Sequence, residues 1–523
     1  MRGYPALSRL PSPGRGDRSM PPVAAAQRSP VFLPHPDPVE HGRPFGLLRW
    51  LDTAWFPWVW MAIWAAMQVG HALVSWHFVA TGAALLRSDG SGAGLHLYVA
   101  HPQLQMGPLT FLAAAPLNGL PTWLSGSVAA VAIAAAGPVM LLSLAHLPHL
   151  SITDRQRGLA AAVLMPLWAE LAVHYTHLDD ALALVLLIAG IHAVARCRPT
   201  TAALLLAASA DAKPWALAFV PLLLVLPRDR RHRTTLVWLA AVSLAWLPFV
   251  LADPHTLHVG GFSIPNVASS SLRALGVTAA STPSWDRPVQ LLAGVVLGAI
   301  AVRRGRWLVL PGVVLAVRML LDPGAYPYYT AGLVLATILL DVGWRRTRWP
   351  WVSMGVVVGL YAVRFLGPLT PPEAVLGWLR AGTLLGVLAV ALGPDWRRRP
   401  SPSLHKGLPT SGKCPDDAPE LGRTSDERRR FGLRFSERAS LGFTSRTTRA
   451  TRSFAERRCS GEVGPQGASQ TRQHGCTRWF LGLDGRRCWS LGLGLYGVDG
   501  RRSFQDRDRG GTREDGGRRV GQR

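Results

Sequence analysis

A single lysine lies inside an apolar stretch of a chain that otherwise uses arginine for positive charge. Lys213 is the only lysine among the first 405 residues, and Asp211 precedes it by two positions. An ionised lysine in the middle of a membrane helix costs ~2.5–3.5 kcal/mol on insertion scales, so such residues usually serve a function. Lys213 predicts a binding site for an anion such as a phosphate or pyrophosphate, with an ion pair to Asp211 as the structural alternative.

Two neighbouring acids begin a predicted helix, in the sequence His174-Tyr-Thr-His177-Leu-Asp179-Asp180. One acid there would be explained by capping of the free amide groups at a helix start. Capping does not explain the second acid or the histidines. The functional alternatives are a general base, a ligand of a divalent cation, or an acceptor for sugar hydroxyl groups, with His177 as a substrate contact. Because the spacing is not diagnostic of a metal site, we assign no metal ligand, and a divalent cation is the one cofactor left open.

A glycine-rich polar segment, residues 88–105, follows the first predicted helix and contains one acid. Asp89 could take the proton of an acceptor hydroxyl group, although an isolated, solvated aspartate is the simpler interpretation. Other side chains of this segment could form hydrogen bonds to a substrate. These are His96, Tyr98, His101, Gln103 and Gln105.

Arg318 and Asp322 lie four residues apart at the end of another predicted helix. This spacing favours a structural salt bridge or a snorkelling arginine, and contact of Arg318 with a substrate phosphate is the functional alternative. Tyr326 and Tyr328 follow closely. Tyrosines in such a place anchor helices at the membrane interface, or they could form a platform for a sugar.

The elements that position these residues are predicted to be membrane helices. The chain is 49% hydrophobic, and its apolar stretches approach the ~20 residues that cross a bilayer. Two segments are predicted not to cross: an embedded helix at 106–120, and a hairpin of two half-helices at 200–226 that is broken at Lys213. We predict an all-α integral membrane protein with ten spans, near residues 55–80, 127–147, 158–175, 181–196, 234–252, 288–303, 307–321, 326–343, 350–366 and 374–392.

Charge divides the chain into three parts and orients it. Residues 396–523 hold 28 of the 56 lysines and arginines but only 14 of the 31 acids. This basic tail and residues 1–50 are predicted to be disordered, and residues 51–395 form the predicted membrane domain. The tail could bind anionic lipid or RNA, but its arginines follow no helical face, so we expect no nucleic-acid partner. The basic loops predict a multi-pass protein of the inner (plasma) membrane with both termini in the cytoplasm.

Taken together, the motifs are similar to those of a known family. They are HLYVAHPQLQMGPL in the first external segment, HLDDALAL at a helix start, ADAKPWALAFVPLLL before a basic loop, and RMLLDPGAYPYYTAGLVLATILLD. Over residues 55–392 the chain resembles polytopic glycosyltransferases of the C-type superfamily, and most of all family 87, the polyprenol-phosphate-mannose-dependent α-mannosyltransferases of actinobacteria. The resemblance implies Asp89 as the catalytic base and Lys213 as a contact of the donor phosphate. Many members of the superfamily have two acids in the first loop, whereas Asp89 stands alone, so Asp179 or Asp180 is the alternative base.

The resulting functional prediction is a membrane glycosyltransferase. It would move a sugar, mannose according to the resemblance, from a polyprenyl-phosphate donor to a glycan or glycolipid acceptor outside the cytoplasm. Lys213 and Arg318 would contact the donor phosphate, and membrane lipids would be the remaining partners. Two other classes stay open: a transporter or lipid flippase, in which a broken helix and buried charges also occur, and a non-catalytic membrane scaffold.

Overall fold

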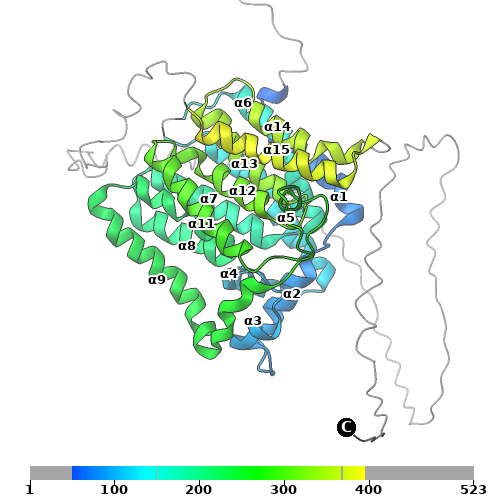
Figure 1. The fold of residues 1–523 in the computed structure, drawn as a ribbon, viewed down its shortest axis with the longest axis vertical. Helices are drawn as coiled ribbons and strands as arrows, with labels where there is room; N and C mark the ends of the chain where they lie inside the picture. Colours follow the sequence, from blue (N-terminus) through cyan, green and yellow to red (C-terminus); the bar gives the residue numbers. More distant parts are fainter. Residues whose placement is uncertain (1–49, 149, 367–368, 395–523) are drawn as a thin grey trace, which may run out of the picture. The chain divides into compact units, whose positions relative to one another are not determined.

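The computed structural model describes residues 50–148, 150–366 and 369–394. All regular structure within these ranges is helical, apart from one isolated antiparallel bridge between Pro265 and Ser281 (Figure 1). The predicted all-α class is therefore confirmed for this part of the chain. The predictions of disorder for the N-terminal segment and for the basic tail fall outside the described residues.

Among the described residues, five helices are long and apolar enough to cross a membrane. They are α5 (Thr122–Leu144), α6 with its continuation η5 (Asp154–Tyr175), α7 (Leu178–Ala195), α9 (Arg228–Ala252) and α15 (Glu373–Leu392). The other predicted spans are also helical, but they are shorter, interrupted or charged at their ends. They include α11 (Asp286–Arg303), α12 (Leu310–Leu321), α13 (Tyr329–Ile338) and α14 (Trp351–Leu360). A membrane protein with several spans follows, and the number of ten stays a prediction.

The first predicted span, residues 55–80, is divided into two helices. α1 (Phe56–Gln68) ends before α2 (Trp76–Leu85) begins, and Leu73 between them has a left-handed backbone with φ of 69°. One continuous helix over this range is therefore a wrong prediction. Three consecutive N–H groups of the linker donate hydrogen bonds of 3.0 Å to the end of α6. The donors are Leu73, Val74 and Ser75, and the acceptors are the carbonyls of Val173, His174 and Tyr175.

These acceptor carbonyls belong to η5 (Glu170–Tyr175), a π-helical turn that ends α6. The last carbonyl groups of any helix lack partners within the helix, and π-helical turns are frequent near functional sites. The linker supplies the missing donors. Ser75 is thereby held close to the start of α7, where the two predicted acids lie.

The predicted break at Lys213 is present. α8 (Pro199–Ala212) ends there, Lys213 itself is extended with φ of −145° and ψ of 116°, and η6 (Pro214–Val225) continues as 3₁₀ turns. Pro214 explains the break, because proline has no N–H group and disfavours a helical conformation in the residue before it. The second arm is a 3₁₀ helix, and the prediction that this hairpin does not cross the membrane stays a prediction.

The residue before α4 (Pro108–Ala114) and the first turn of this helix dock onto the break. The carbonyl of Ala212 accepts hydrogen bonds of 2.9 Å from the N–H of Gly107 and from the hydroxyl of Thr110. A Cβ atom on Gly107 would overlap the carbonyl oxygen of Asp211, so only glycine allows this approach. A carbonyl group at a helix break needs a hydrogen-bond donor from elsewhere in the protein, and α4 provides two here.

The main apolar core lies between α5, α6, α7, α12 and α13. In it the indole of Trp168 donates a hydrogen bond of 2.7 Å to the carbonyl of Ile133. In contrast, α9 lies at one edge of the bundle (Figure 1). Only 6% of its most apolar stretch is buried. Leu244 and Leu251 on α9 are each 75% exposed. A soluble protein rarely exposes such a surface, which fits contact with lipid.

Candidate functional site

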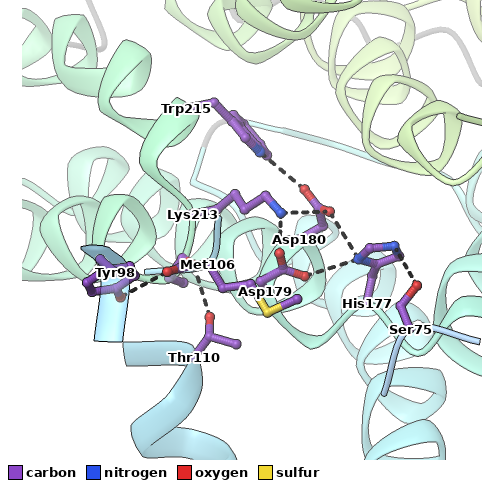
Figure 2. Close-up of polar contacts among 10 residues, drawn as sticks. Ser75, Tyr98, Met106, Thr110, His177, Asp179, Asp180, Lys213 and Trp215 are labelled. Carbon is purple, nitrogen blue, oxygen red and sulfur yellow. Dashed lines mark hydrogen bonds and ion pairs between the residues drawn. The ribbon is translucent and has the colours of Figure 1, made fainter. Parts of the chain in front are cut away.

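The side chain of Lys213 reaches the start of α7. Its ammonium group donates a hydrogen bond to Oδ2 of Asp179, and its Nζ atom lies 3.7 Å from Oδ2 of Asp180 (Figure 2). The three residues are almost fully buried, with exposed fractions of 9% for Lys213, 0% for Asp179 and 3% for Asp180. The structural alternative, an ion pair of Lys213 with Asp211, is therefore wrong, because the partners are Asp179 and Asp180.

Both acids lie in the first turn of α7, but neither caps it. The N-cap residue is His177, and the helix start has no side-chain cap. Instead, Oδ1 of Asp180 accepts a hydrogen bond of 3.1 Å from the indole of Trp215, the second residue after Lys213. The capping interpretation is wrong, and both carboxylates interact with side chains at the break between α8 and η6.

His177 connects this cluster to the linker before α2. Its Nδ1 atom lies 3.3 Å from Oδ1 of Asp179 and 3.7 Å from Oδ2 of Asp180. Its Nε2 atom lies 3.2 Å from Oγ of Ser75 (Figure 2). A buried chain of polar contacts thus runs from Ser75 through His177 and Asp179 to Lys213, and such networks fix the positions of their members.

Aromatic side chains enclose the histidine. The ring of Tyr328 stacks on His177 with 3.9 Å between centroids, and Tyr326 lies 5.6 Å from Tyr328. Tyr175 contacts both rings, 5.9 Å from that of His177 and 5.0 Å from that of Tyr328. Both predicted tyrosines therefore belong to the surroundings of the site.

A cavity of about 170 Å³ lies beside Lys213. Arg318 lies over the rings of Tyr329 and Trp215, 3.8 and 4.9 Å from their centroids. Asp322 lies beyond the end of α12 and accepts a hydrogen bond from the N–H of Gly324. Within the described residues it forms no ion pair with Arg318, so the salt bridge, one of the two structural interpretations of this spacing, is wrong. The polar lining of the cavity consists of Gln105, Lys213, Arg287, Gln290 and Arg318, and its aromatic lining of Trp215, Trp246 and Tyr329.

The structure brings together most of the predicted residues, but few from the first loop. Among the loop candidates only Gln105 lines the cavity. Tyr98 is buried in a separate apolar cluster and donates a hydrogen bond of 2.9 Å to the carbonyl of Met106. The remaining loop candidates are exposed or half-buried, without a described contact to the cavity or to the cluster around Lys213. They are Asp89, His96, His101 and Gln103.

Several residues of the site were not predicted from the sequence. Trp215 and Tyr329 are close neighbours of predicted residues, so a wider search around Lys213 and Tyr328 would have found them. Arg287 and Gln290 form a polar start to the otherwise apolar α11, which is itself an unusual pattern in a membrane helix. No sequence pattern indicates Ser75, because its contact with His177 depends on the docking of the linker onto the end of α6.

The acid pair and His177 offer a donor set that a divalent cation accepts. One ligand atom from each of His177, Asp179 and Asp180 lies within 4.8 Å of the others, and carboxylates with imidazole bind several divalent metals. Lys213 competes for the same carboxylates, because its ammonium group already lies within ion-pair distance of both. The ammonium group of Lys213 is therefore the cation that these carboxylates already contact.

No family model, curated protein or solved structure matches the chain. The fold and the site define its class on their own. Its described part is helical and includes five helices long and apolar enough to span a membrane. A buried charged cluster lies beside a cavity at the break between α8 and η6.

Proposed function

We propose that the protein is an integral membrane glycosyltransferase that moves a sugar from a polyprenyl-phosphate donor to an acceptor outside the cytoplasm. Mannose is the sugar that the family resemblance implies. One observation carries the proposal: the cavity beside Lys213 gathers three cationic side chains, Lys213, Arg287 and Arg318, between apolar helices. Lys213 is already paired with Asp179 and Asp180. The negative charge of a phosphate group would therefore compensate the buried Arg318 and the half-buried Arg287.

Arg318 supports a phosphate ligand most directly. Its guanidinium group contacts aromatic rings rather than a carboxylate, and guanidinium groups match the geometry of phosphate oxygens. The cavity of about 170 Å³ is smaller than the ~300–1,000 Å³ of sites that enclose drug-sized ligands. It suits a polar headgroup whose isoprenoid chain remains outside. Trp246 brings the lipid-facing α9 to the cavity wall, which offers the chain a place along that helix.

In the proposed reaction an acceptor hydroxyl oxygen forms a bond to the anomeric carbon of the sugar. The bond from that carbon to the phosphate oxygen breaks, and its electron pair stays on the phosphate. Lys213 and Arg318 stabilise this developing charge, an effect that gains strength where water is excluded. Asp180 takes the proton of the hydroxyl group, because its Oδ2 atom accepts no hydrogen bond from the described residues. Asp179 positions Lys213.

This assignment of the base differs from the one that the family resemblance implies. Asp89 lies on an exposed loop, whereas Asp180 is joined to the cavity wall through Trp215. The proposal therefore expects Asp89→Asn to retain transfer and Asp180→Asn to lose it.

The test is transfer of labelled mannose from polyprenyl-phosphate mannose to the acceptors present in membranes that contain each variant at equal abundance. Lys213→Ala and Arg318→Ala should lower the rate by about 10²–10³-fold, the usual effect of removing one transition-state donor. Arg155→Ala is the matched control for Arg318, because Arg155 also lies over a tryptophan, 5.8 Å from the ring centroid of Trp349. Asp154→Asn is the control for Asp180→Asn, since Asp154 is 63% exposed.

Transfer at the wild-type rate by both Lys213→Ala and Asp180→Asn would overturn the proposal. Movement of polyprenyl phosphate between the bilayer leaflets without any sugar transfer would instead favour the flippase class.

A further inference from the structure

Behind the wall of the cavity lies a second group of buried polar side chains. We define the polar cluster as Asp286 on α11, Arg318 on α12, Asp322 after α12, and Arg380 on α15. Their exposed fractions are 0%, 5%, 0% and 7%. Asp322 interacts electrostatically with each of the other three, so the four residues belong to one environment.

The polar cluster adjoins the cavity at two points. Arg318 belongs to both. Gln290 lines the cavity and donates a hydrogen bond of 2.8 Å to Oδ2 of Asp286, and another of 3.2 Å to the carbonyl of Leu321. A ligand in the cavity would therefore contact Arg318 and Gln290 directly, and Asp286 lies one hydrogen bond behind Gln290.

The cluster has an unusual number of polar atoms without partners. Of the fifteen buried side-chain nitrogen and oxygen atoms that lack a hydrogen bond in the described ranges, five belong to these four residues. Buried polar atoms are almost always paired, and each unpaired one costs about 1–3 kcal/mol. Such a concentration directly behind the wall of a cavity points to a polar ligand that would complete it.

The types of these atoms define the ligand. Three are donors, namely Nε of Arg318 and both Nε and Nη2 of Arg380. Two are acceptors, namely Oδ1 of Asp286 and Oδ2 of Asp322. A simple anion would satisfy only the donors, and a cation only the acceptors. The two aspartates and the two arginines also cancel in formal charge. A neutral group that carries several hydroxyls fits both conditions, because each hydroxyl both donates and accepts.

We propose that the polar cluster is the subsite for the sugar ring of the lipid-linked donor. This inference rests on the proposed function above and adds the residues that select the sugar. Hydroxyl groups of the ring donate to Asp286 and Asp322 and accept from Arg318 and Arg380. Arg318, which borders both regions, contacts the phosphate and the ring together, as the direct bond between these two groups requires.

The test measures binding without an acceptor, so that no transfer occurs. Full-length protein in lipid nanodiscs is titrated with polyprenyl phosphate and, separately, with polyprenyl-phosphate mannose. The ratio of the two dissociation constants is the contribution of the sugar. Asp322→Asn should reduce this contribution about tenfold, as expected for one hydrogen bond to a charged group, and should leave the affinity for polyprenyl phosphate within about twofold. The amide oxygen of the substituted side chain can still accept the hydrogen bond of 2.8 Å that Gly324 donates to Asp322.

Two further variants distinguish an effect on sugar binding from an effect on folding alone. Arg380→Gln removes donors from the opposite side of the cluster and should also reduce the contribution of the sugar. Asp341→Asn is the matched control, because Asp341 is equally buried but its oxygens accept hydrogen bonds from Val352 and Ser353. The control should lower stability and keep the contribution of the sugar unchanged.

The outcomes separate this inference from the proposed function. If the wild-type protein binds both lipids equally, or if Asp322→Asn and Arg380→Gln weaken both equally, the cluster is structural and hydrated, and the sugar subsite is refuted. If the wild-type protein binds neither lipid, the proposed function itself is refuted.

Discussion

The ion pairs of Lys213 allow a prediction that does not depend on any enzymatic activity. Lys213→Met leaves Asp179 and Asp180 buried beside each other without their cation, and breaking a buried pair in this way costs about 3–5 kcal/mol. Asp179→Asn costs less, about 1.5–3 kcal/mol, because Asp180 remains 3.7 Å from the ammonium group. The double variant lacks the lysine and retains only one acid of the pair, Asp180, without a cation. Its cost should therefore be below the sum of the two single costs by about 1–3 kcal/mol.

The assay is reversible unfolding of the purified protein in detergent micelles by added SDS, with the free energy of unfolding compared across the four proteins of the cycle. Glu170 and Arg364 form the control pair, since their ion pair of 2.9 Å leaves Arg364 36% exposed, and partly exposed pairs couple by at most about 1 kcal/mol. Additivity of the Lys213 and Asp179 effects within about 0.5 kcal/mol would refute the reasoning. A larger cost for Asp179→Asn than for Lys213→Met would refute it as well.

Two more predictions concern stability. Gly107→Ala should destabilise the protein by about 1–3 kcal/mol, because its Cβ would overlap the carbonyl of Asp211. The control is Gly119→Ala, whose Cβ would have nothing within 4 Å and which should change stability by less than about 0.5 kcal/mol. Equal effects of the two variants in unfolding assays would contradict this prediction. Hydrogen bonds from the backbone N–H of His255 and then from its ring hold the pKa of Asp253 below its ordinary value, so this stabilisation is complete above pH ~4 and is lost as the pH falls through the lowered pKa. Stability measured from pH 6 down to 3 should therefore decline less in Asp253→Asn, and an identical decline would show that these bonds contribute nothing.

The sequence predicted the break at Lys213 well, because the cause is local. Pro214 follows the lysine directly, and its missing N–H group acts on the neighbouring turn. The partner of Lys213 could not be found in the same way. Asp179 lies 34 residues away in the chain, and the contact depends on how α7 packs against α8. Sequence proximity instead favoured Asp211, which lies on the last turn of α8.

The prediction for Arg318 and Asp322 was wrong for a geometric reason. Residues four positions apart face each other only while the helix continues. α12 ends at Leu321, and Asp322 is extended, with φ of −73° and ψ of 127°. Its carboxylate instead accepts the N–H of Gly324. One residue at a helix end therefore decided whether the pair forms, and helix ends are the least predictable part of a pattern.

The first loop was also difficult to interpret from its composition. Its polar residues suggested a single substrate-binding segment, but Tyr98 packs against Trp246 and Phe249 of α9. The segment is thus divided between a buried structural anchor and an exposed stretch that includes Asp89. Which residues of a loop are buried depends on the distant helix that it meets, and periodicity does not contain this information.

The docking of α4 on the broken helix has a mechanical consequence. Two hydrogen bonds to the Ala212 carbonyl, each worth about 0.5–1.5 kcal/mol net, join α4 to the last residue of α8, directly before Lys213. A motion of α8 away from α4 would break both bonds. A carrier that moved these two helices apart would lose them in every cycle, whereas a catalyst benefits from an ammonium group that stays in place between turnovers.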